Sequence, residues 1–124
     1  MDIIADALTR IRNASLREKK EVVLRKNKVI VALVDILKKE GFVDDYSHDE
    51  SHVTVQLSYT NGKPVITHIS RVSRGGQRQY VKASDLGLVM RGRGIGVIST
   101  SHGVMTTEDA RNKGVGGEYI CKIW

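Results

Sequence analysis

Two hydrophobic repeats with helical spacing, separated by short runs rich in valine, most constrain how this chain can fold. The first repeat brings five apolar side chains to one face of a helix: Ile3, Ile4, Ala7, Leu8 and Ile11. Asp2 or Asp6 lies near its start, and Arg10 and Arg12 lie on the other side. The spacing therefore predicts an amphipathic helix with a basic flank.

The second helix is predicted between clear start and stop signals. Asn27 is a suitable N-cap for a helix over residues 28–40, and Gly41 is suited to end it. The valine-rich run at 21–24 that precedes the cap predicts a strand. A helix, a strand and a second helix are thus expected within the first 41 residues.

Three further strands are expected before residue 73. Residues 42–46 and 52–59 predict two of them, and the second alternates Val53, Val55, Leu57 and Tyr59 on one face. Asn61 and Gly62 have the chemistry of a tight hairpin turn, so 65–72 predicts the return strand, with Ile66 or Ile69 available for the core. The first half is therefore predicted to be α-β-α-β-β-β.

The composition changes at Ser73, after which Gly and Arg accumulate. We therefore predict an α/β domain at 1–72 and a strand-rich domain at 73–124. In the second, short strands are expected at 79–82, 96–99, 103–105 and 118–123, and Thr106 or Thr107 is expected to cap a brief helix that extends to Asn112. The predicted fold class is α+β, with two small domains.

The charge is basic but unevenly distributed. The net charge of +6 divides into +4 for residues 1–40 (ten basic, six acidic), −3 for 41–70 (one, four) and +5 for 71–124 (nine, four). A basic balance favours a polyanionic partner. The two ends are expected to share an RNA-facing surface, although a merely mixed surface fits the charges about as well.

A single cysteine, Cys121, excludes an internal disulfide and a thiolate metal cluster. No apolar run approaches the roughly 20 residues of a membrane span, and no signal peptide is recognisable at the amino terminus. We expect an intracellular protein without membrane attachment or a small-molecule substrate.

Three patterns that superficially indicate other chemistry have simpler interpretations. His48, Asp49, Glu50 and His52 are better explained by a solvated loop than by a metal site. The glycines at 92, 94 and 96 do not match G-x-G-x-x-G, so tight turns and close packing are preferred to a nucleotide loop, and no cofactor is expected. A hydrolase built on Ser101 and His102 lacks an orienting carboxylate, so catalysis is not expected.

Hydroxyl groups are concentrated in the segment from Ser99 to Val104. Ser99, Thr100 and Ser101 can each donate and accept hydrogen bonds, which suits phosphates, ribose hydroxyls and base edges of an irregular RNA helix. Gly103 permits a turn or a close backbone approach. Local chemistry alone favours an ordinary Ser/Thr turn over an RNA contact.

Motifs along the whole chain favour the RNA contact over the ordinary turn. The motifs are Ile4 to Ala14, Leu37 to Phe42, Arg71 to Arg74, Ser99 to Thr106, Ala110-Arg111 and Gly114 to Glu118. In this order they resemble the family of the eighth protein of the small ribosomal subunit, in its bacterial and organellar form. The family consists of structural proteins, not enzymes.

The resemblance implies binding to the central domain of 16S-type rRNA early in small-subunit assembly, which helps to build the platform. It also implies a neighbouring fifth small-subunit protein and, in some members, translational repression of the protein's own operon. The cytoplasm is the expected compartment, with the plastid stroma as the alternative. Carried over position by position, it implies RNA contacts at Thr9, Arg12, Asn13, Asn27, Lys28, Tyr80, Ser99, Thr100, Ser101, His102, Gly103, Val104, Gly116, Gly117 and Glu118.

The chain departs from the family pattern at three places. Where the family commonly has Pro-Gly-Leu-Arg, this chain has Gly75, Gly76, Gln77 and Arg78, so a rigid turn and an apolar anchor are lost before Tyr80. Arg93 replaces a residue that is often apolar. His102 replaces a frequent Lys, and a neutral imidazole attracts phosphate less strongly.

Overall fold

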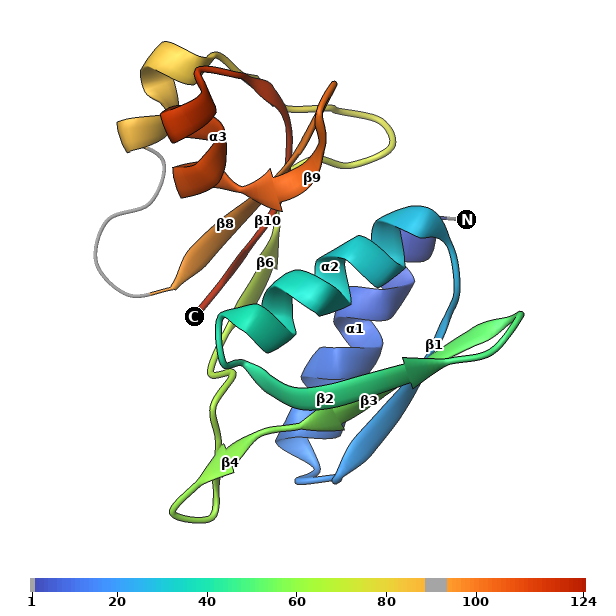
Figure 1. The fold of residues 1–124 in the computed structure, drawn as a ribbon. Coiled ribbons are helices and arrows are strands. Elements are labelled where there is room, and N and C mark those ends of the chain that lie inside the picture. The colour runs from blue at the N-terminus through green and yellow to red at the C-terminus, as the bar shows by residue number, and fades with distance from the viewer. Residues whose placement is uncertain (1, 89–93) are drawn as a thin grey trace. The chain divides into compact units, whose positions relative to one another are not determined.

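The computed structural model describes residues 2–88 and 94–124, which form two compact units, the first ending at His68 and the second beginning at Ile69 (Figure 1). We call them the first and the second unit. The change of unit comes immediately before the short strand at Ile69–Arg71, whereas the composition of the sequence places the domain boundary just after it. The fold is mixed α+β, as predicted.

The first unit places two helices over one face of a three-stranded antiparallel sheet (Figure 1). Its elements are α1 (Ile3–Leu16), β1 (Glu21–Arg25), α2 (Lys28–Lys39), β2 (Val43–His48), β3 (His52–Leu57), β4 (Tyr59–Thr60) and β5 (Lys63–Pro64). The sheet order is β1-β3-β2. The core forms between helices and sheet, and its largest fully buried side chains are Leu8, Ile11, Leu24, Ile30, Leu33, Leu37, Val34, Val53 and Val55.

Residues that the sequence identified set the start of both helices and the end of α2. The Asp2 carboxylate accepts hydrogen bonds from the backbone N–H groups of Ile4 and Ala5, and Asn27 Oδ1 accepts one from Ile30 N at 2.7 Å. Gly41, with φ of +82°, follows the last turn of α2. Each cap satisfies backbone groups that the helix itself cannot pair.

The prediction of a return strand at 65–72 is wrong. Asn61 and Gly62 do form the expected turn, with φ of +53° and +77°, but the hairpin stops at Pro64 after two residue pairs. One further backbone hydrogen bond follows, from the Val65 N–H to the Ser58 carbonyl oxygen at 3.0 Å, but no third residue pair forms. The chain re-enters a sheet only at β6 (Ile69–Arg71), which pairs with the last strand of the second unit.

The second unit is assembled around the last strand of the chain. Its elements are β6, β7 (Tyr80–Val81), the 3-10 helix η1 (Ala83–Leu88), β8 (Ile95–Thr100), β9 (Gly103–Thr106), α3 (Thr107–Lys113) and β10 (Gly117–Ile123). The sheet order is β6-β10-β8-β9, and β7 also pairs with β10. The strands β7 to β10 and the helix α3 lie where the sequence predicts them, with Thr106 as the N-cap; η1 was not predicted.

One face of this sheet packs against α3 and η1. The hydrophobic cluster there joins Ile98 of β8, Met105 of β9, Ala110 of α3 and Leu86 of η1. Because side chains alternate along a strand, the residues next to Ile98 and Met105 point to the opposite face. No helix among the described residues is long and apolar enough to cross a membrane.

Candidate nucleic-acid interface

Four of the predicted site residues lie opposite one another across four strands. Glu118 of β10 pairs with Tyr80 of β7 on one side and with Ser99 of β8 on the other, and Ser99 in turn pairs with Val104 of β9. Side chains directly opposite on neighbouring strands share a face and lie about 5 Å apart at Cβ. We call these four residues the rung; they lie on the sheet face opposite the cluster around Ile98.

The hairpin that joins β8 to β9 continues from the rung into an exposed tip, residues 100–103. Thr100 Oγ1 donates to the carbonyl oxygen of Gly103 at 2.9 Å and accepts from the backbone N–H of His102 at 3.0 Å. Ser101 and His102 form the exposed turn, and Gly103 has φ of +111°, which favours glycine. The Thr100 hydroxyl therefore holds the turn, which leaves Ser101 and His102 to face outward.

Gly116 and Gly117 bring three strands of this surface into close contact. A Cβ on Gly116 would overlap the carbonyl oxygen of Val81, and one on Gly117 would overlap the carbonyl of Ser99. Both collisions would be with backbone, which cannot rotate away. The two glycines therefore set the positions of the chain around Tyr80 and Ser99, a role that differs from direct contact with a ligand.

The departure before Tyr80 still forms a closed turn. Arg74 and Gln77 exchange two backbone hydrogen bonds, at 3.1 and 3.0 Å, around Gly75 and Gly76. Tyr80 follows with its side chain directed largely into solvent, at 71% exposure. The loss of proline thus leaves a turn in place, and an exposed aromatic ring is presented beside the rung.

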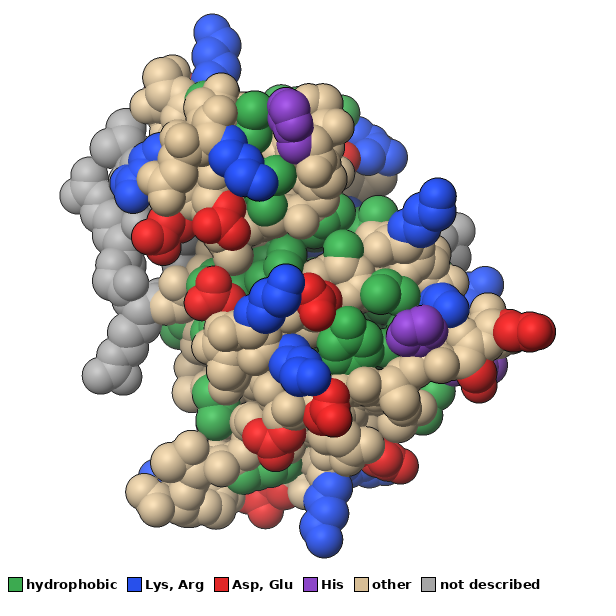
Figure 2. Space-filling view, viewed as in Figure 1, with side chains coloured by type: hydrophobic (Ala, Val, Ile, Leu, Met, Phe, Trp, Pro, Cys, Tyr) green, Lys and Arg blue, Asp and Glu red, His purple; other side chains and the backbone are tan. Residues whose placement is uncertain are grey.

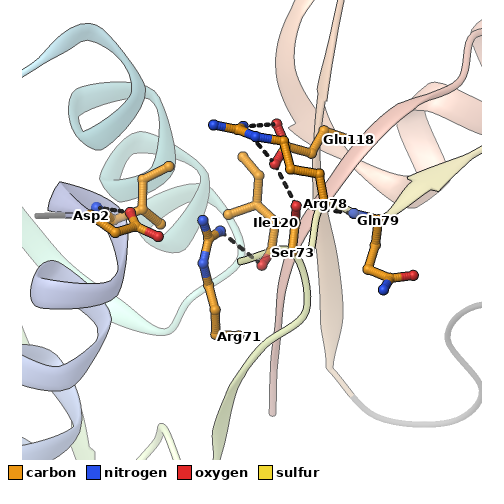
Figure 3. Close-up of polar contacts among 8 residues, drawn as sticks. Asp2, Arg71, Ser73, Arg78, Gln79, Glu118 and Ile120 are labelled. Carbon is orange, nitrogen blue, oxygen red and sulfur yellow. Dashed lines mark hydrogen bonds and ion pairs between the residues drawn. The ribbon is translucent and has the colours of Figure 1, made fainter. Parts of the chain in front are cut away.

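Polar contacts to Glu118 replace the apolar anchor (Figure 3). Arg78 Nη1 lies 3.0 Å from Glu118 Oε1 and 3.1 Å from Oε2, and Ser73 Oγ donates to Oε2. Ser73 Oγ also accepts from the backbone N–H of Gln79 at 3.1 Å. Sequence reasoning did not assign a role to Ser73 or Arg78 in this cluster, because each meets Glu118 only after distant segments have paired.

The predicted contacts in the first unit occupy two exposed places. Thr9, Arg12 and Asn13 are exposed on one side of α1, as spacings of three and four residues require. Lys28 is exposed at the first turn of α2, beside the half-buried cap Asn27. The oxygen of Asn27 is committed to the cap, so only its amide NH₂ remains for an outside partner.

Asn27 and Lys28 also line an open hollow of about 770 Å³ beside α2. Its wall includes Lys26, whose Nζ lies 3.0 Å from His48 Nδ1. Tyr46 is another wall residue. The wall therefore combines cations and an aromatic ring with two carboxylates, Asp35 and Glu50.

Within that wall, the Tyr46 hydroxyl donates to Asp35 Oδ1 at 3.1 Å. A hydrogen bond from Lys39 is the main cause that lowers the pKa of Asp35, with the Tyr46 hydroxyl contributing in the same direction. Burial, followed by the bond to Asp35, raises the pKa of Tyr46. The carboxylate and the phenol are thus both in their ordinary ionisation states near neutral pH.

The segment 48–52, which contains residue types that can bind metal ions, forms a turn between β2 and β3. Asp49 accepts hydrogen bonds from the backbone N–H groups of Ser51 and His52, both at 2.8 Å. Within residues 2–88 and 94–124, no three His, Cys, Asp or Glu side chains are grouped so that they could hold a metal ion.

Two glycines of the segment that resembles a nucleotide loop, Gly94 and Gly96, allow close packing. A Cβ on Gly94 would meet the backbone of Ile123 and Trp124, and one on Gly96 would meet the side chains of Thr107 and Tyr119. Gly92 and Arg93 lie outside the described residues.

Charges of both signs are interspersed on the face drawn in Figure 2. Ion pairs of the first unit include Arg10 with Asp6 at 2.9 Å and Lys39 with Asp35 at 2.9 Å, each with an exposed basic side chain. Such pairs contribute little to stability. On this face, the mixed arrangement of charge fits better than a continuous basic field.

Comparison with known proteins identifies the family. The family model described as "Ribosomal protein S8" matches residues 2–124. The chain is 48% identical to the small ribosomal subunit protein uS8 of Oleidesulfovibrio alaskensis, over 99% of this chain and 98% of that one. It is also 48% identical to the protein of the same name from Nitrosomonas europaea, over 98% and 96% of the two chains. The chain therefore belongs to the ribosomal protein S8 family, whose members are structural proteins of the small ribosomal subunit and not enzymes.

Proposed function

We propose that this protein binds a helix in the central domain of 16S-type rRNA through the rung and the hairpin tip, and thereby helps to assemble the platform of the small subunit. The observation that carries the proposal is the alignment of Tyr80, Glu118, Ser99 and Val104 across four strands. It places an exposed aromatic ring, a hydroxyl and an apolar side chain on one rigid surface. An irregular RNA helix, with unstacked bases and 2′-hydroxyls, offers partners for each.

Side chains of the first unit are proposed to hold the phosphate backbone. Arg12 and Lys28 supply positive charge, and Thr9, Asn13 and the Asn27 amide supply hydrogen-bond donors beside them. Contacts of this type fix position on the RNA without reading its sequence. The hairpin tip is proposed to recognise the helix, since Ser101 and His102 are exposed there.

The test is binding to a transcript of the central-domain helix, compared with an unrelated duplex of equal length. Lys28→Ala should weaken binding to both RNAs and reduce the salt dependence by about one phosphate contact. Ser101→Ala should cost roughly 1 kcal/mol on the correct helix and little on the other. Lys63→Ala and Ser47→Ala, which change exposed residues of the same types outside the proposed site, are the matched controls. A wild-type protein without preference for the central-domain helix would refute the proposal.

The remaining assignments rest on the family. The fifth small-subunit protein is proposed as a neighbour, and the bacterial relatives favour a cytoplasmic ribosome over a plastid one. Repression of the protein's own operon would be an additional role of the same surface. It requires a messenger segment that competes with the rRNA helix for the protein, which a competition titration measures directly.

A further inference from the structure

We propose that Glu118 is a positioning residue: with Ser73 and Arg78 it holds the segment before Tyr80 in place, and it does not itself contact RNA. This inference rests on the proposed function, because it concerns how Tyr80 is presented to the RNA. It concerns a residue that the family resemblance alone would assign to the RNA contact. The structure offers three independent reasons.

The first reason is the occupancy of the carboxylate. Oε1 accepts from Arg78, and Oε2 accepts from both Arg78 and Ser73. The Glu118 side chain is only 17% exposed. An ionised carboxylate accepts hydrogen bonds but donates none, and phosphate oxygens also only accept, so Glu118 has no donor to offer a phosphate. Its own acceptors are already used by Arg78 and Ser73.

The second reason is the position of Ser73, which is completely buried. Its hydroxyl oxygen accepts the backbone N–H of Gln79 while its proton is donated to Glu118. The Gln79 carbonyl oxygen in turn accepts the N–H of Tyr119 at 2.8 Å. Gln79 is therefore fixed on both sides, one residue before Tyr80.

The third reason is that β7 alone is too short to hold Tyr80. It contains two residues, and one of its two pairs is Tyr80 with Glu118. Pairs this few are marginal without further packing. With the turn closed by two glycines in place of proline, the contacts of Ser73 and Arg78 with Glu118 supply the rigidity that the sequence departure removed.

Arg78 has a second consequence for the same surface. Among the described residues, Glu118 is the hydrogen-bond partner of its side chain, which remains 57% exposed. The guanidinium group has five N–H donors in a fixed plane, and the contacts to Glu118 come from Nη1 alone. The contact with Glu118 therefore uses one nitrogen atom of the guanidinium group and leaves the other donors to solvent.

The experiment is a double-mutant cycle on RNA binding, combined with amide hydrogen exchange in the free protein. Glu118→Ala should weaken binding to the central-domain helix about tenfold in the wild-type background, but about twofold or less when Tyr80→Ala is already present. In the free protein, the amides of Gln79 and Tyr119 should exchange faster. Glu118→Gln, which keeps an acceptor for Ser73 at nearly the same volume, should fall between wild type and Glu118→Ala.

The control is Glu40→Ala, an exposed residue at the end of α2 that removes the same charge. Because loss of a negative charge favours RNA binding, Glu40→Ala should leave affinity unchanged or slightly higher, so weaker binding by Glu118→Ala cannot come from the change of charge. Additive losses from Glu118→Ala and Tyr80→Ala, with unchanged amide exchange, would overturn the inference and make Glu118 a direct contact.

Failure of the proposed function gives a different result. If the wild type does not prefer the central-domain helix, the proposed function falls, whereas the exchange of the Gln79 amide still decides whether Glu118 holds the segment. Unchanged exchange in both Glu118→Ala and Glu118→Gln would overturn the inference. If Glu118→Ala does not fold, the same cycle and exchange measurement are made with Glu118→Gln and Arg78→Ala.

Discussion

The two units use different means to place their polar groups. In the first unit, the proposed contacts lie on helices whose position follows from local signals: an amphipathic repeat and the cap Asn27. In the second unit, they lie on a sheet that exists only after β10 has paired with β6, β7 and β8. The first arrangement suits charges that need only approximate placement, and the second suits groups that must match a shape.

This difference explains why the two units contribute different kinds of contact to the proposed function. Phosphate attraction varies slowly with distance, so a Lys on an exposed helix turn is sufficient. Recognition of bases or ribose needs hydrogen-bond geometry within a few tenths of an ångström. The rung meets that need because backbone pairing and the close approach at Gly117 fix it.

The largest effect is expected from Gly117→Ala. Its Cβ would overlap the Ser99 carbonyl, and since neither backbone can move freely, we expect a loss of about 3 kcal/mol in stability. Gly114→Ala is the matched control: it has φ of +70° but open space, so strain of about 1 kcal/mol is expected. Urea unfolding monitored by amide signals of each unit measures both. Equal losses would contradict the role of the close approach at Gly117, and a loss in the first unit would break the distinction between the units.

The sequence predicted the features that nearby residues determine, but not the pairing of distant segments. Both helices and the turn at Asn61 and Gly62 were predicted because their determinants lie within a few residues. The pairing of β6 with β10 was not, because it joins segments about 50 residues apart and nothing near Ile69 specifies the partner. The return strand was predicted wrongly because the Asn61-Gly62 turn indicates a hairpin but not its length, and only two residue pairs form.

The candidate site shows the same limit. The family resemblance identified Tyr80, Ser99, Val104 and Glu118 separately, but their alignment depends on the register of β10, which periodicity does not encode. The bulge after Tyr119 shifts that register by one residue, so an ideal alternation drawn along β10 would misplace part of the strand. The contact of Arg78 with Glu118 likewise appears only in three dimensions.

A smaller effect tests whether Asn27 serves the helix, the RNA or both. Asn27→Ala should cost about 1 kcal/mol of stability because the cap is lost. Asn27→Asp keeps a capping oxygen at the positive end of the helix, so stability should be retained while the new charge weakens RNA binding. Thermal unfolding and an RNA titration measure the two effects. If Asn27→Asp bound RNA as well as wild type, Asn27 would act only as a cap.

Removing one tyrosine hydroxyl from each unit should change stability in different ways. The Tyr46 hydroxyl donates to Asp35, so Tyr46→Phe should cost about 1 kcal/mol of stability. The Tyr119 hydroxyl is buried without a hydrogen-bond partner among the described residues, so Tyr119→Phe should leave stability unchanged or raise it by up to about 1 kcal/mol. Denaturant unfolding at pH 7 checks both signs. A cost for Tyr119→Phe would indicate that the hydroxyl is satisfied in solution.

The stability of wild type and of Tyr119→Phe should also differ in its dependence on alkaline pH. Burial raises the pKa of Tyr119 from 10.0 to about 12, so the unfolded chain releases the proton at a lower pH than the folded one. The associated stability is complete below pH 10 and falls as the pH rises toward 12. Tyr119→Phe should lose less stability than wild type over this range, whereas the loss from buried Cys121, whose pKa is raised to about 12, is common to both.

The smallest expected effect comes from His102→Lys, which would add to the hairpin tip the kind of charge that the first unit supplies. It should bind RNA somewhat more tightly, with a salt dependence steeper by about one phosphate contact. His52→Lys, at an exposed position in β3, adds the same charge away from the tip and should change affinity less. Because an ammonium attracts any phosphate, the gain should be similar for the central-domain helix and an unrelated duplex, so the ratio of the two affinities should stay constant or fall. A gain confined to the central-domain helix would mean that charge at the tip contributes to recognition, and the division of anchoring and recognition between the two units would then no longer hold.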